Sequence, residues 1–159
     1  MKLFFDEAVL AHKPTQFMVA GRIVTPVENP DRAVALAGVL EAIGLTITLP
    51  IDSGLDPIHA VHAEHYTCFL REAYDRFVAL PDHGPEVWPN AHPYLSAGPD
   101  LARRPPPRAT GIIGRAGWYV GDMACAIMAG TWGAAYASAQ TAIGGADALL
   151  TGERAAYAL

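Results

Sequence analysis

The sequence contains little cysteine and no stripe of basic residues, and both shortages narrow what the chain can be. Only Cys68 and Cys125 occur in 159 residues, each among apolar neighbours and without a C-x-x-C spacing. A redox pair or a zinc knuckle is therefore not expected. We predict two small buried thiols in a reducing cytoplasm. The 11 Lys and Arg residues are scattered along a chain of net charge −5, so nucleic acid is not an expected partner.

Long apolar segments of the membrane or secretory kind are also missing. No charged residue occurs between Met123 and Ala146, but this stretch consists mostly of Ala and Gly with several polar residues. Such residues gain little from hydrocarbon, so we expect no membrane span. The apolar start of the chain is interrupted by Asp6 and Glu7, which is too early for the core of a secretory signal. A composition of 52% hydrophobic and 17% charged residues is typical of a globular domain.

Alternating helix and strand signals predict an α/β fold with a parallel sheet. Asn29 and Thr131 are the expected caps of two helices, and 6–29 shows no periodicity, which predicts a long loop. Three strands are few for a parallel sheet, which is normally covered on both faces, so the sheet is expected to be incomplete. We expect strands at 2–5, 45–49 and 155–159, helices at 29–44, 63–80 and 131–150, and a short helix from Asp56.

A proline-rich segment interrupts this pattern at about 81–111. Eight prolines fall between Pro81 and Pro107, with Trp88 and Tyr94 among them. Loops of this length inside compact domains are usually functional or interfacial. We therefore predict a loop insertion within a single domain that spans 1–159.

Two motifs of possible chemical interest have simpler interpretations. His59, His62 and His65 spread over about 120° of a helix surface, since each residue turns the helix by about 100°. This spread is wide for ligands of one ion, so surface histidines are favoured and a shared metal is the weaker alternative. The G-x-x-G-x-x-G run at 111–117 does not follow a strand and lacks a following Lys-Ser/Thr, which favours turn or helix-entry glycines. No G-x-S-x-G elbow or activated cysteine is present.

Several segments occur in an order that is typical of one family. Val61 to Leu70 reads V-H-A-E-H-Y-T-C-F-L, and Gly130 to Ala135 reads G-T-W-G-A-A. The strands at 2–5 and 155–159 and the E-N-P-D-R segment at 28–32 complete the order. Together they resemble the N-terminal part of the histone deacetylase superfamily, and most closely the bacterial acetylpolyamine amidohydrolases.

This resemblance implies a three-layer arginase-deacetylase α/β fold and zinc-dependent hydrolysis of an N-acyl amide. In the family the strand that matches 155–159 continues into an Arg-Pro-Pro-Gly-His-His motif, and the zinc ligands come later. We therefore expect the catalytic motifs and the Zn²⁺ ligands after residue 159, no catalytic or metal-binding residue before it, and an inactive chain in isolation. The alternative is a non-catalytic oligomerisation or binding module that keeps the front half of the fold.

The resemblance also assigns residues to the substrate tunnel and its rim. Arg32 matches an arginine that lines an inner channel, although an ion pair at the start of a helix explains it equally well. Phe17 and Ile113 match positions at the tunnel mouth. Family members that act on acetylated polyamines have carboxylates there, so two apolar residues imply a less cationic substrate, such as a neutral amide or a single acyl-lysine. A homodimer formed through the loop region 81–119 is implied as well.

Overall fold

The described chain forms two compact units, each assembled from segments that are distant in the sequence. The computed structural model describes residues 1–27, 29–93 and 105–159. The first unit comprises Met1–Lys13, Glu28–Ile58 and Gly130–Leu159, and the second comprises Pro14–Val27 and His59–Ala129. Each unit is described by itself.

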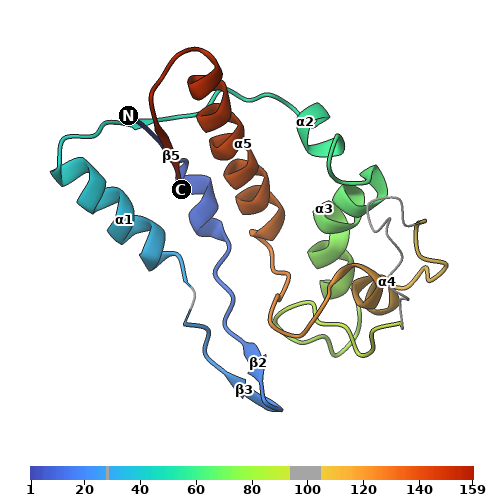
Figure 1. The fold of residues 1–159 in the computed structure, drawn as a ribbon. Helices are drawn as coiled ribbons and strands as arrows, with labels where there is room; N and C mark the ends of the chain where they lie inside the picture. The colour runs from blue at the N-terminus through green and yellow to red at the C-terminus, as the bar shows by residue number, and fades with distance from the viewer. Residues whose placement is uncertain (28, 94–104) are drawn as a thin grey trace. The chain divides into compact units, whose positions relative to one another are not determined.

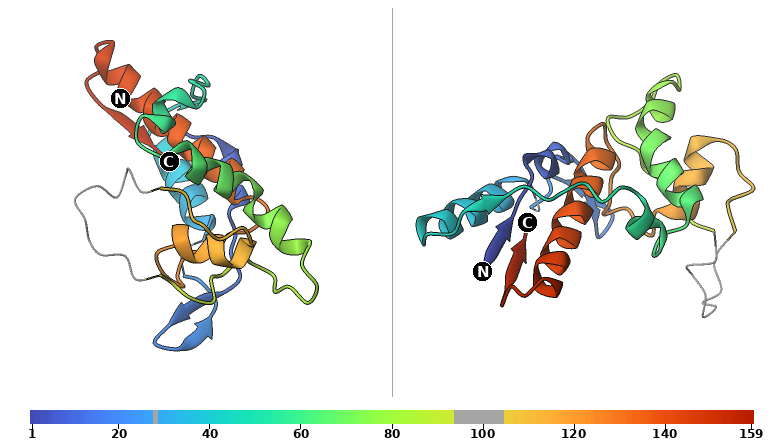
Figure 2. Two further views of the ribbon diagram at one scale, coloured as in Figure 1. Left: turned by 90° about the vertical axis from the view of Figure 1, so that its right-hand side faces the viewer. Right: turned by 90° about the horizontal axis from the view of Figure 1, so that it is seen from above.

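A small parallel sheet is the centre of the first unit. It contains β4 (Ile47–Thr48), β1 (Lys2–Phe4) and β5 (Ala156–Ala158), in that order, with β1 in the middle. Leu3 lies opposite Ile47 on one side and Tyr157 on the other, and its side chain is fully buried. The two ends of the chain therefore belong to adjacent strands (Figures 1 and 2). The three predicted strands and their parallel pairing are confirmed.

One long helix of the first unit packs against this sheet. The 20-residue helix α5 (Thr131–Leu150) contacts β1, β5 and the short helix η1 (Glu7–Ala11). It approaches the sheet closely at Gly144, where an added methyl group would lie 3.2 Å from the Phe4 ring. The remaining helices are α1 (Asp31–Ala42), which precedes β4, and the one-turn α2 (Asp56–His59).

Both predicted helix caps are displaced by one residue. The Asn29 side chain does accept a hydrogen bond of 2.9 Å from the Asp31 backbone N–H, but Pro30 occupies the cap position of α1. Thr131 is the first residue of α5 rather than its cap, and Gly130 takes the cap position without a side-chain hydrogen bond.

A hairpin and two packed helices make up the second unit. The strands β2 (Phe17–Val19) and β3 (Arg22–Val24) are antiparallel and are joined by Ala20 and Gly21, both at positive φ. This segment lies within the loop predicted from the sequence, so that prediction is wrong here. Ala-Gly lacks the Asn-Gly or Asp-Gly signal by which such turns are usually found.

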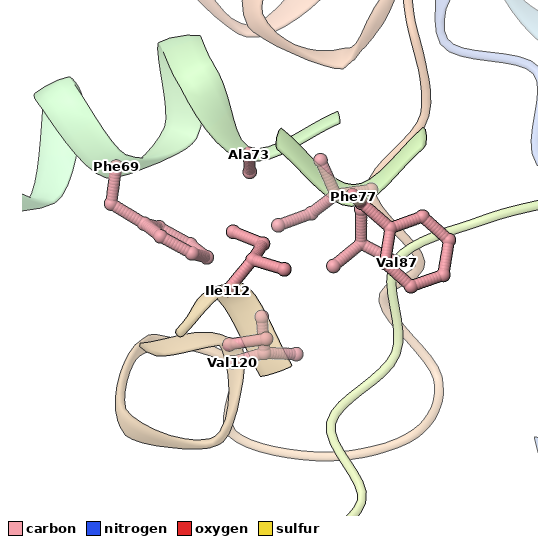
Figure 3. Packing of buried hydrophobic residues seen from close by; sticks show 8 residues of the cluster. Phe69, Ala73, Phe77, Val87, Ile112 and Val120 are labelled. Carbon is pink, nitrogen blue, oxygen red and sulfur yellow. The ribbon is translucent and has the colours of Figure 1, made fainter. Parts of the chain in front are cut away.

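The core of the second unit lies between α3 (Glu64–Val78) and α4 (Ile112–Tyr119). Phe69, Ala73 and Phe77 recur every four residues on one face of α3 and point toward Ile112 of α4 and toward Val87 (Figure 3). The predicted helix 63–80 is confirmed. The glycine run at 111–117 is at the start of α4 and within it, with Gly111 at the cap position.

The described parts of the proline-rich segment contain no helix or strand. Val87 forms an isolated bridge with Ile127 through backbone hydrogen bonds of 2.8 and 3.3 Å. The central part of the predicted insertion, 94–104, lies outside the described residues. Among the helices that are described, none is long and apolar enough to cross a membrane.

The prediction of two buried thiols is wrong. Cys68 and Cys125 are both exposed, and neither of them forms a disulfide. Cys68 precedes Phe69 in α3 and therefore lies off the face formed by Phe69, Ala73 and Phe77, so apolar sequence neighbours did not bring it into the core. Crowding around the Cys125 thiol nevertheless raises its pKa by desolvation.

Candidate functional site

Glu86 and Trp88 lie on the same side of a short extended segment. Val87 between them is paired with Ile127, and its side chain is fully buried in the α3–α4 core. Side chains of an extended backbone alternate between two faces. The core therefore receives Val87, while Glu86 and Trp88 both line a cavity on the other side.

Glu86 is held in place by the loop that leads into β2. Its side chain is 6% exposed, and Oε1 accepts hydrogen bonds from both the backbone N–H and the hydroxyl group of Thr15. The second carboxylate oxygen, Oε2, is buried and has no hydrogen-bond partner among the described residues. The indole Nε1 of Trp88 is in the same situation. Buried polar atoms in native proteins are nearly always paired, so these two require an explanation.

The cavity has a volume of about 380 Å³ and is lined by residues from both segments of the second unit, Pro14–Val27 and His59–Ala129. The hairpin contributes Gln16 and Ile23, α3 contributes Phe77, and α4 contributes Ile113. Binding sites for small molecules are typically concave, apolar and furnished with a few polar groups, and their volumes are roughly 300–1,000 Å³. This cavity therefore has the composition and size of a site for a small molecule.

A charged cluster joins α3 to α4 elsewhere in the second unit. Glu72 accepts hydrogen bonds from Arg115 and Arg76, the latter at 3.2 Å, and Arg115 is the more buried of the two cations. The Arg115 guanidinium is the main reason that the pKa of the Glu72 carboxyl is lowered. The cluster therefore acts as a polar link between the two helices.

Tyr119 gathers aromatic groups next to this cluster. Its ring stacks on Phe69 with centroids 4.6 Å apart, and its hydroxyl group lies 2.8 Å from Nδ1 of His65. Burial raises the pKa of the Tyr119 hydroxyl. An open hollow of about 760 Å³ is lined by His65, Tyr119 and Arg115 among others. Among its polar groups, His65 is paired with Tyr119, whereas Arg76 and Arg115 are paired with Glu72. These contacts are those of a structural cluster.

The structure places the three residues that the resemblance assigned to the tunnel in two different units. Ile113 is half-buried, packs against the α3–α4 core and lines the 380 Å³ cavity. Phe17 is the first residue of β2, and its neighbour Gln16 also lines that cavity. Arg32 lies in the first turn of α1, in the first unit, with an exposed side chain. The second unit therefore brings Ile113 and the Phe17 hairpin together. Whether the three residues line a tunnel stays a prediction.

The three histidines at 59, 62 and 65 do not gather around a common point. His59 Nε2 lies 3.0 Å from the Thr67 hydroxyl, which itself donates to the Glu64 carbonyl, so His59 must be the donor in this pair. The His62 ring lies against Tyr66 in a tilted arrangement with centroids 5.6 Å apart, whereas His65 contacts Tyr119. Among the residues that the structure describes, no three His, Cys, Asp or Glu side chains could hold a metal ion. Zinc therefore does not fit this part of the chain.

Sequence reasoning did not find Glu86, Trp88 or Thr15 as site residues. Glu86 is an isolated acid in the proline-rich segment, and Thr15 is 71 positions away. The sequence drew attention to Trp88 as an aromatic residue among prolines, but it did not indicate which residues Trp88 would contact.

Comparison with known proteins shows which proteins this chain resembles. The chain is an α/β protein with a parallel sheet of the type found in acetylpolyamine amidohydrolases, and its similarity to their N-terminal part is confirmed. An acetylpolyamine amidohydrolase of Burkholderia pseudomallei is 34% identical over 160 residues, which cover all of this chain and 44% of that protein. The corresponding enzyme of Mycoplana ramosa is 35% identical, again over the whole chain and over 45% of its own length.

A solved structure shows the same relation. The crystal structure of an acetylpolyamine aminohydrolase from Burkholderia pseudomallei superimposes with a TM-score of 0.89 and 34% identity, over 99% of this chain and 44% of that one. A scan against models of protein families finds no match. The chain thus spans less than half the length of the relatives that it matches.

Proposed function

We propose that this chain is the N-terminal part of a zinc-dependent amidohydrolase that cleaves an N-acyl amide. The observation that carries the proposal is the similarity over the entire chain, at 34% identity and a TM-score of 0.89, to proteins named for this activity. The catalytic motifs and the Zn²⁺ ligands are assigned to the part of the relatives' length that this chain does not span. The described residues contain no metal-binding group of their own, and no catalytic step is attributed to them.

We assign Phe17, Ile113 and Arg32 to the tunnel and its rim. Support comes from Ile113, which lines a cavity next to the β2–β3 hairpin to which Phe17 belongs. An apolar Ile113 attracts no ammonium group. The proposed substrate is therefore less cationic than an acetylated polyamine, for example a neutral amide or a single acyl-lysine.

The region 81–119 is the proposed homodimer contact, and the cytoplasm is the proposed location. A long proline-rich segment is typical of interfacial loops, which supports the first assignment. A second candidate function is a non-catalytic oligomerisation or binding module.

Hydrolysis by the native protein tests the proposal. N-butylacetamide and N-acetylputrescine would be incubated with zinc-loaded protein and with protein treated with a chelator. We expect chelator-sensitive hydrolysis, with a higher kcat/KM for the neutral amide. Activity that survives complete removal of zinc contradicts the zinc dependence. No activity on any acylated amine contradicts the enzyme proposal and favours the binding module. A higher kcat/KM for N-acetylputrescine contradicts only the substrate assignment.

A further inference from the structure

The β2–β3 hairpin forms one wall of the 380 Å³ cavity but packs on little else. Gln16, immediately before β2, and Ile23 of β3 both line the cavity, whereas the other described lining residues belong to 77–90 and to α4. All three residues of β3 are exposed, and Ile23 is 58% exposed. Among the elements that the structure describes, no helix packs extensively against either strand. A two-stranded hairpin is marginally stable in water, so this wall depends on specific attachments.

Hydrogen bonds at two places attach the hairpin to the rest of the second unit. Glu86 Oε1 accepts from both the backbone N–H and the hydroxyl group of Thr15, the latter at 2.9 Å. Met18 N–H donates to the Met123 carbonyl over a longer distance of 3.3 Å. Because a carboxylate is a stronger acceptor than a carbonyl, the contact between Thr15 and Glu86 is the firmer attachment. It lies at the base of the hairpin, two positions before β2.

The two partners of this contact differ in how firmly they are held. Glu86 is 6% exposed, and the next residue, Val87, is fully buried in the α3–α4 core and paired with Ile127 by hydrogen bonds of 2.8 and 3.3 Å. Thr15 is exposed. A fixed acceptor in the core thus holds donors on an exposed arm of the chain. The contact can break without any loss from the α3–α4 core.

We propose that the β2–β3 hairpin is a lid on this cavity and that the Thr15–Glu86 contact is the latch that holds it closed. Opening moves Gln16 and Ile23 out of the cavity wall and widens access to Phe77 and Ile113 on the other walls. Glu86 is then a positioning residue, which acts through Thr15. The inference depends on contacts within the second unit alone, so it holds whether or not the protein hydrolyses amides.

Amide hydrogen exchange of the 159-residue chain, followed by nuclear magnetic resonance, tests the latch. The Met18 amide reports on the lid, and the Val87 amide, bonded to Ile127, reports on the core. Thr15→Val removes one donor to the carboxylate from an exposed position, so exchange at Met18 should accelerate about 10-fold or more. Exchange at Val87 should stay unchanged. Thr15→Ser keeps the hydroxyl group and should retain the slow exchange at Met18.

Thr25→Val is the matched control. It makes the same chemical change at an exposed threonine immediately after β3, and this threonine does not donate to Glu86. Exchange at Met18 should therefore remain within about 2-fold of that in the natural chain, because the latch is intact.

Low concentrations of urea provide a second test on the unaltered chain. A local opening exposes little surface, so exchange at Met18 should be nearly independent of urea, whereas exchange at Val87 should accelerate because it requires a larger unfolding. Equal urea dependence at both amides would overturn the lid. The latch would be overturned by unchanged exchange at Met18 in Thr15→Val, by equal acceleration at Met18 and Val87, or by an equal effect of Thr25→Val. The urea series needs no variant, so the test stays decisive if a substitution prevents folding.

Discussion

Adding one methyl group at Gly130 should destabilise the first unit, whereas adding one at Gly133 should not. A methyl group at Gly130 would overlap the backbone carbonyl of Ala11, the last residue of η1. A carbonyl cannot turn aside as a flexible side chain can, so η1 or the start of α5 must move. The hydrogen bond of 2.9 Å between His12 Nδ1 and the Thr131 hydroxyl joins the same two segments and would be strained by that movement.

The size of the effect follows from these contacts. Overpacking of a well-packed site costs about 1–3 kcal/mol, and weakening one hydrogen bond adds about 0.5–1.5 kcal/mol. Alanine restricts the unfolded chain more than glycine does, which returns about 0.4–1 kcal/mol. Gly130→Ala should therefore lower the free energy of unfolding by about 0.5–4 kcal/mol, from the sum of these terms.

Gly133→Ala is the matched control, one turn further along the same helix. Nothing lies within 4 Å of a methyl group at this position, which is exposed. Alanine in a helix interior is favoured over glycine by about 0.5–1 kcal/mol, so this variant should be slightly more stable than the natural chain. Urea titration followed by far-ultraviolet circular dichroism measures both midpoints. A Gly130→Ala midpoint equal to or above that of Gly133→Ala would refute the packing described for η1 and α5.

Three further predictions concern the core, the response to acid and the proposed tunnel rim. Phe69→Ala should lower the free energy of unfolding by about 3–5 kcal/mol, because a buried ring that stacks on Tyr119 is lost. In urea titrations, Phe69→Leu should lose clearly less stability than Phe69→Ala. Equal losses in the two variants would contradict the packing. Hydrogen bonds from the Tyr136 hydroxyl and, to a smaller extent, from the Gly54 N–H lower the pKa of the exposed Asp52 carboxyl. The stabilisation that results is complete above the unfolded-state pKa of about 4. It is lost as the pH falls through the lower folded-state pKa. Tyr136→Phe should therefore be less stable than the natural chain at neutral pH and lose less stability below about pH 4, and urea midpoints with parallel pH profiles would contradict this. In an active native protein, Ile113→Glu should raise kcat/KM for N-acetylputrescine about 2- to 5-fold over Ile113→Gln, as expected for a partly exposed charge pair; no difference would remove Ile113 from the rim.

Much of the fold was predictable because its elements carry local signals. Phe69, Ala73 and Phe77 repeat with the period of a helix that buries one face, and the alternation in 45–49 indicated the strand that became β4. The hairpin β2–β3 was missed because Ala20 takes a positive φ without the residue types that usually announce it. The close approach of Gly130 to Ala11 was equally hidden, because these two residues are distant in the sequence.

The candidate site was less predictable than the fold. Ile113 was identified only through the resemblance to a family, and its position in a cavity wall depends on how α4 packs. The positions of Glu86 and Trp88 depend on the pairing of Val87 with Ile127 and, for Glu86, on the hydrogen bonds from Thr15. Each of these contacts joins segments tens of residues apart, so no local pattern could have announced them.

The mass of the native protein, measured by mass spectrometry after purification from its source, tests the central proposal most directly. The chain has a mass of 16.9 kDa and matches 44% of a relative. If it is the N-terminal part of an amidohydrolase, the native protein should have more than twice that mass. A native mass of 16.9 kDa would contradict the proposal, because the catalytic motifs and zinc ligands would then be absent from the protein, and would favour the non-catalytic binding module.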